Sequence, residues 1–185
     1  MGVLEEKPRD GRTAAASVDP SARHALVTDV MAWIEATALA TWVRESPSLW
    51  AYPTVLALHT VGLGIVVGAS TVVDLRLLGY ARRIRIATLT PLFRLMAYAF
   101  ALNTATGILL FMADATTKSK QPVFFIKLLL IFAALWCTMQ VRRVVVATDS
   151  VEATDRIPVQ ARRLAWITLL LWTGAITAGR LMAYL

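Results

Sequence analysis

The feature that most constrains this chain is the run of residues 53–73, 21 residues in which His59 is the single ionisable side chain. At a helical rise of ~1.5 Å per residue, such a run crosses the ~30 Å hydrocarbon core of a bilayer. Trp50 and Tyr52 precede it, as amphipathic rings do at the level of the lipid headgroups. Gly79 follows it and is suited to ending a helix. The run therefore predicts a transmembrane helix that carries a histidine near its start.

The rest of the chain repeats this apolar character. Of 185 residues, 57% are hydrophobic and the mean hydropathy is +0.61, which is too apolar for a soluble domain of this length. Three more apolar blocks of spanning length follow, at about 92–113, 122–141 and 164–185. The sequence thus predicts an all-α, polytopic membrane protein in which residues 46–185 form a four-transmembrane-helix bundle.

The N-terminal part differs in composition from the bundle. Residues 1–26 are polar and small, which is typical of a disordered polar tail. Residues 27–45 carry apolar groups at helical spacing, including Trp33 and Trp42, but they also carry Glu35 and are too short to span. We expect one interfacial amphipathic helix here, centred on residues 29–43.

The net charge of +7 comes largely from arginines that flank the apolar blocks, so we expect a lipid bilayer and no nucleic acid as the partner. The connections after the first and third blocks carry five arginines each, and the connection between them carries only Lys118 and Lys120. By the positive-inside rule, the arginine-rich connections face the cytoplasm and both termini lie outside a bacterial inner membrane. The arginines are Arg76, Arg82, Arg83, Arg85, Arg94, Arg142, Arg143, Arg156, Arg162 and Arg163.

Three ionisable residues lie at matched depth in the outer third of the predicted membrane region. His59 is six residues past Pro53, Lys127 is five past the start of its block, and Arg180 is five before residue 185. Lys127 and Arg180 can reach the surface, whereas a histidine ring is too short to cover ~9 Å. Intramembrane ionisable residues often mark functional sites, although a hydrogen-bonded structural histidine is the alternative. We predict that an uncharged His59 faces the same interior cavity as Arg180.

Other residues are expected to support this outer end. Asn103, Asp114 and Lys127 are predicted structural polar residues, and a buried Asn103 needs a partner across helices. Met112 and Met182 lie at the same end as candidate soft ligands, with packing as the alternative. Glycines are expected where helices approach closely, namely Gly64, Gly68, Gly107 and Gly174.

Several segments carry a resemblance to a known family. The stretches WAYPTVLALHTVGLGIVVGASTVVDLRLLG, TGILLFMADA, FFIKLLL and AGRLMAYL resemble an uncharacterised bacterial family of small four-helix inner-membrane proteins, over roughly residues 30–185. The P-x5-H-x2-G and DLRLLG elements are the most specific. The layout is also loosely similar to copper-resistance D-type and b561-type cytochrome membrane proteins. The b-type proteins hold haem between paired histidines, a pattern from which this chain departs because His59 is its single intramembrane histidine.

No nucleophile, base and acid set, phosphate loop or HExxH motif is visible, and the single Cys137 excludes a CxxC motif. No catalytic residue is therefore assigned, and an enzymatic role stays open.

The leading hypothesis is a non-catalytic membrane or accessory subunit of a redox or copper-related system, with a polar pocket around His59. One alternative is a b-type haem electron carrier, in which His59 pairs with Met112, with Met182 or with His59 of a second copy, and Arg180 lies near a propionate. Another is a metal or small-solute transporter with Cu(I) on His59 and the methionines. A plain structural bundle is the last. Haem b and copper are the candidate cofactors, and a homo-oligomer or larger membrane complex is the expected assembly.

Overall fold

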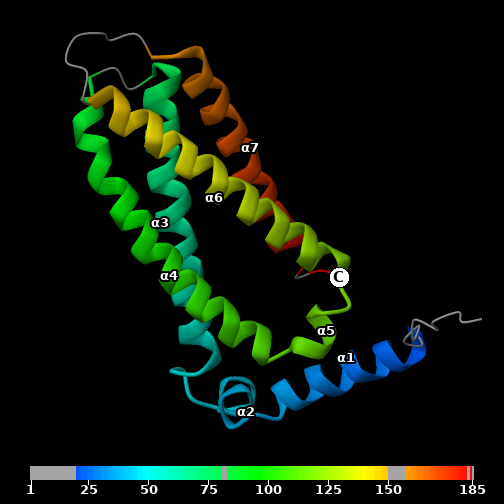
Figure 1. Cartoon of the computed structure of the whole chain (residues 1–185). Coiled ribbons are helices and arrows are strands. Elements are labelled where there is room, and N and C mark those ends of the chain that lie inside the picture. The colour runs from blue at the N-terminus through cyan, green and yellow to red at the C-terminus, as the bar shows by residue number, and fades with distance from the viewer. Residues whose placement is uncertain (1–19, 81–82, 150–156, 183, 185) are drawn as a thin grey trace, which may run out of the picture.

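The computed structural model describes residues 20–80, 83–149, 157–182 and 184, and this part of the chain is helical with short connections (Figure 1). Four helices are long and apolar enough to cross a membrane, which fits an integral, multi-pass membrane protein and confirms the predicted all-α four-helix bundle. These helices are α3 (Tyr52–Leu78), α4 (Thr90–Met112), α6 (Pro122–Asp149) and α7 (Val159–Leu181).

The ends of the long helices follow local sequence rules. Pro53 and Pro91 occupy the first turns of α3 and α4, where a missing N–H costs nothing. At the other end of α3, Gly79 has a φ of 96°, and the N–H groups of Gly79 and Tyr80 donate to the carbonyls of Arg76 and Leu75. This is a Schellman cap, which favours glycine because of its left-handed backbone.

Three helices extend further than the apolar blocks that predicted them. α3 continues beyond residue 73 to Leu78, and α6 continues beyond residue 141 to Asp149. α7 begins at Val159, ahead of the expected residue 164. Hydropathy falls where arginines begin, but arginine is a good helix former, so the backbone hydrogen bonding continues past the apolar region.

The four helices pack as two antiparallel pairs, α3 with α4 and α6 with α7, and α3 also packs against α7. Two buried apolar clusters receive side chains from all four helices. One lies around Val73, Phe93, Val145 and Ala165, and the other lies mid-bundle around Val66, Ala99, Ala134 and Trp172. The bundle therefore has two apolar core clusters, each built by all four helices.

The connections divide between two ends of the bundle (Figure 1). At the arginine-rich end, α3 and α6 end and α4 and α7 begin. At the opposite end, which we call the α5 end, lie α1 (Pro20–Glu35), α2 (Ala38–Glu45), α5 (Ala115–Lys118) and the C-terminus. A short 3₁₀ helix, η1 (Ile86–Leu89), precedes α4. Because the starts of α3 and α6 and the end of α7 share the α5 end, His59, Lys127 and Arg180 lie toward the same end.

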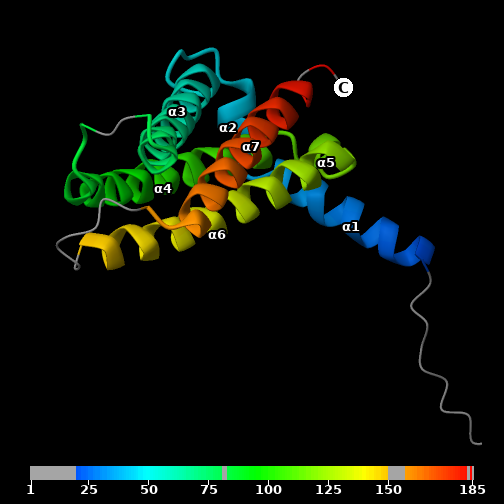
Figure 2. The same cartoon turned by 90° about the horizontal axis from the view of Figure 1, so that it is seen from above.

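The N-terminal segment differs from the single helix that was expected. α1 and α2 are separate helices, bent by 68° at residues 36–37, and α1 extends beyond the bundle (Figure 2). The Thr37 side chain accepts a hydrogen bond from the Ala40 N–H as the N-cap of α2 and donates to the Ile34 carbonyl. Residues 20–26, assigned to the tail, belong to α1, whereas residues 1–19 lie outside the described residues.

Candidate functional site

His59 is held by α4. Its side chain is half-buried on the face of α3 that also carries the buried Gly62 and Val66. His59 Nδ1 lies 2.9 Å from the Asn103 carbonyl oxygen and 3.2 Å from Thr106 Oγ1. In return, Asn103 Nδ2 donates to the His59 carbonyl oxygen at 2.7 Å. This reciprocal pairing gives Asn103 the cross-helix partner that a buried amide requires.

The pairing specifies how the imidazole is oriented. A backbone carbonyl can only accept, so the 2.9 Å bond to the Asn103 oxygen places the proton on Nδ1, whereas in the other tautomer Nδ1 would accept from Asn103 Nδ2, which lies 3.3 Å away. The shorter distance favours the arrangement in which Nδ1 donates. Thr106 Oγ1 is also 2.8 Å from the Leu102 carbonyl oxygen and 3.1 Å from that of Asn103, to which a threonine hydroxyl donates. In the neutral ring, the lone pair is then on Nε2, which is the nitrogen that stays available to a ligand.

Two glycines allow α3 and α4 to approach at this point. A Cβ on Gly62 would lie 3.1 Å from the Ala99 oxygen and 3.2 Å from Asn103 N. A Cβ on Gly107 would lie 3.1 Å from His59 Cε1 and 3.5 Å from Nδ1. Gly107 thus packs under the histidine ring, at a close contact that any larger residue would disturb.

The glycine pair expected on α3 does not make a contact within the described chain. Gly64 and Gly68 are exposed, and a Cβ on either would have no atom within 4 Å. Because each helical residue advances ~100° around the axis, Gly64 lies on nearly the opposite face from Gly62. Close approach of a helix at this pair stays a prediction for a neighbour outside the described chain. Gly174 does pack, since its Cβ would lie 3.4 Å from Leu130 Cδ1.

Lys127 and Arg180 differ in their surroundings at this end of the bundle. Lys127 is half-buried and lies across Gly179 of α7, where an added Cβ would be 3.5 Å from Lys127 Cε and 3.6 Å from Nζ. Arg180 is exposed, and none of the described hydrogen bonds or ion pairs joins it to His59. The structure therefore gives no support to the predicted cavity shared by His59 and Arg180.

The remaining predicted residues surround the α5 end. Asp114 lies 3.5 Å from Lys118 Nζ, and the same ammonium donates to the Leu110 carbonyl oxygen at 2.9 Å. Met112 ends α4 and Met182 follows α7, and both are half-buried. Met112 lies five residues past Gly107, ~8 Å further along the helix axis, so the histidine ring and this thioether lie at different levels.

Sequence reasoning missed two residues that the structure shows to be important. Thr106 belongs to the His59 contact, and its position three residues from Asn103 places it on the contacting face of α4. Asp74, which follows the first apolar run, is the second: it is only 1% exposed and accepts a hydrogen bond from Ser70 Oγ at 3.3 Å. Its spacing from Val66, Ser70 and Val73 was the signal that it faces the core.

Among the described residues, no group of three or more histidine, cysteine, aspartate or glutamate side chains could hold a metal ion. His59 therefore offers a single nitrogen ligand within this part of the chain. Comparisons of the chain with protein-family models, with curated proteins and with solved structures find no match, so the site is interpreted from its own geometry.

Proposed function

We propose that this integral membrane protein is a non-catalytic membrane or accessory subunit of a redox or copper-related system, in which His59 supplies one imidazole ligand. The observation that carries the proposal is the 2.9 Å hydrogen bond from His59 Nδ1 to the Asn103 carbonyl oxygen. Metal-ligating histidines characteristically donate the other ring N–H to a carbonyl, carboxylate or water, which fixes the tautomer and the ring orientation. His59 has this arrangement, with Nε2 as the ligating atom.

The surroundings add to this argument. The ring is half-buried, Gly107 leaves room for it, and Thr106 is a second polar contact at Nδ1. An imidazole with one nitrogen satisfied by a neighbouring helix is preorganised, so a ligand at Nε2 does not need to immobilise it. The hydrogen bonds described for the ring are all at Nδ1, so Nε2 is the nitrogen that a ligand would use.

An accessory role is favoured because the described chain supplies too few ligands. A haem b held by two histidines does not fit within one copy, and Met112 lies at a different level along α4. A copper site also needs further donors. The remaining ligands would therefore come from a second copy of this chain or from a different subunit of the same complex.

The test uses the full chain, expressed in a bacterium and purified in a mild detergent. Absorption spectra, metal analysis and identification of co-purifying proteins are compared for the wild type, His59→Ala and His24→Ala. His24 is the matched control because it is exposed on α1. We expect the cofactor, or the cofactor-bearing partner, to be lost in His59→Ala alone, with helical content and monodispersity unchanged.

The results separate the alternatives. A haem absorption band that disappears in His59→Ala selects the haem carrier, and copper that disappears without a haem band selects a copper-related role. A protein that carries no cofactor and retains every partner in His59→Ala would contradict the proposal and leave a structural bundle.

A further inference from the structure

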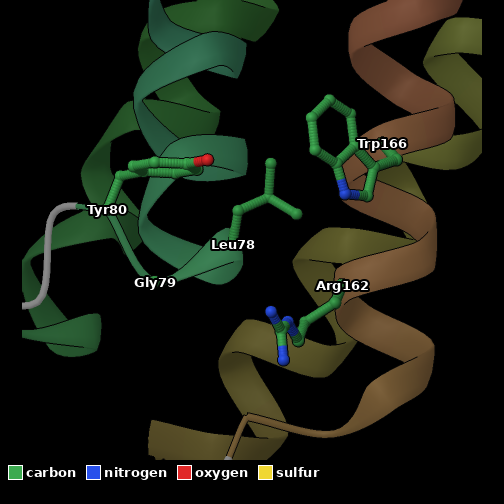
Figure 3. Close-up of a pocket in the computed structure, with 5 residues that line it drawn as sticks. All are labelled: Leu78, Gly79, Tyr80, Arg162 and Trp166. Atoms are coloured by element: carbon green, nitrogen blue, oxygen red, sulfur yellow. The ribbon is translucent and has the colours of Figure 1, made fainter.

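A cavity of about 150 Å³ lies at the arginine-rich end, far from His59, between the end of α3 and the first two turns of α7. Leu78, Gly79, Tyr80, Arg162 and Trp166 line it (Figure 3). Figure 3 shows the Tyr80 hydroxyl, the Arg162 guanidinium and the Trp166 indole nitrogen turned toward the space beside Leu78. Polar donors from α7 and from the turn that follows α3 thus surround the apolar side chain of Leu78.

The chemistry of this lining selects an anion. A guanidinium and an indole N–H can only donate hydrogen bonds, and a tyrosine hydroxyl can do so. None of the lining residues is acidic, and the described residues give Arg162 no carboxylate partner. The N-terminal end of α7 carries a partial positive charge, while the Schellman cap of α3 occupies the Leu75 and Arg76 carbonyls that would repel an anion.

We propose that this cavity binds the phosphate of an anionic phospholipid. Tyr80 and Trp166 are 77% and 55% exposed at the ends of membrane-length helices, which is where amphipathic rings meet lipid headgroups. Arg162, Trp166 and Leu170 follow one another at intervals of four residues, so they lie along one face of α7. When Arg162 binds the phosphate and Trp166 lies beside the glycerol, the exposed Leu170 contacts an acyl chain of the same lipid.

The size and the wider electrostatics agree with a lipid headgroup. At ~30 Å³ per water, a cavity of about 150 Å³ holds roughly five waters, which suits a phosphate with adjoining glycerol oxygens while the chains stay in the bilayer. Basic groups near a membrane surface attract anionic lipids. The exposed arginines described at this end are Arg83, Arg85, Arg94, Arg142, Arg143, Arg162 and Arg163.

The experiment titrates the full chain, in mild detergent, with phosphatidylglycerol and with phosphatidylcholine, and counts bound lipids by native mass spectrometry. We expect one tightly held phosphatidylglycerol. Arg162→Gln should weaken its binding about tenfold, the effect of losing a charged hydrogen-bond donor. Arg163→Gln is the matched control, because Arg163 is equally exposed but does not line the cavity. The affinity of Arg163→Gln for phosphatidylglycerol should fall by less than about threefold, because Arg163 contributes only to the overall positive charge at this end.

Each other outcome decides against the proposal. Equal losses in Arg162→Gln and Arg163→Gln would show a general charge effect and no site. Inorganic phosphate that binds in the absence of lipid, with the same dependence on Arg162, would show a free-phosphate site. If Arg162→Gln does not fold, Tyr80→Phe removes one donor with little change in shape. It should weaken phosphatidylglycerol binding about threefold, and unchanged binding would overturn the assignment.

Discussion

At the scale of single residues, Gly107 lies against the His59 ring with no room for a side chain. An alanine there would place its Cβ 3.1 Å from His59 Cε1, so the ring or the backbone must shift. Overpacking costs about 1–3 kcal/mol, against a gain of up to ~1 kcal/mol in helix propensity. We therefore expect Gly107→Ala to destabilise the protein by about 1 kcal/mol, measured as a lower midpoint of thermal unfolding in detergent.

Gly64→Ala is the matched control, because an added Cβ there has no atom within 4 Å. It gains helix propensity with no clash, so its midpoint should equal or exceed that of the wild type. Equal midpoints for the two variants would show that the His59 ring does not pack against Gly107.

Much of the site residue set could be predicted, because each signal is local. His59 is conspicuous in an apolar run, and Asn103 and Gly107 share a helical face by spacing alone. The sequence could not predict which helix packs against the His59 face of α3, since four helices of similar hydropathy can pair in several ways. Arg180 and Lys127 have matched depth in the sequence, but the rotation of α7 turns Gly179 toward Lys127 and leaves Arg180 exposed.

At the scale of elements, α1 is attached to α5 by one charged hydrogen bond. Glu35 Oε1 accepts from the Thr116 backbone N–H at 2.6 Å, and α1 packs against α5. Glu35→Ala should release this amide and speed its hydrogen exchange about tenfold, which mass spectrometry can follow in peptides covering residues 113–121. Asp29→Ala on the exposed face of α1 is the control and should leave that exchange unchanged.

If exchange at Thr116 were the same in Glu35→Ala and the wild type, α1 would not be docked through this bond.

The break between α1 and α2 shows the limit of sequence-pattern reasoning at the scale of elements. Residues 29–43 have helical periodicity throughout, and only the side chain of Thr37 capping the Ala40 N–H reveals a second start. A single sequence does not distinguish a threonine inside a helix from a threonine that caps the start of the next helix.

At the scale of the whole molecule, the architecture was predictable because hydrocarbon admits helices with internally satisfied backbones. Four apolar blocks thus gave four helices, and short connections gave antiparallel neighbours. The packing of α3 against α7 was not predictable, because the apolar faces of these helices differ little in composition. The cavity at Tyr80 and Arg162 depends on that packing, so it too had to come from the structure.

The orientation of the molecule in the membrane is the last prediction. The structure places the ends of α3 and α6 at one end of the bundle and α5 at the other, so the two arginine-rich connections must face the same side (Figure 1). That side should be the cytoplasm by the positive-inside rule. Reporter fusions at Arg83 should therefore read cytoplasmic, and fusions at Lys118 should read periplasmic. The polar Asp29 is exposed on α1, so Asp29→Cys in a Cys137→Ser background should react with an impermeant thiol reagent added from outside. Protection of position 29 from that reagent would mean that α1 and α2 form a broken fifth span, and reversed reporters would invert the molecule and move the proposed lipid site to the outer leaflet.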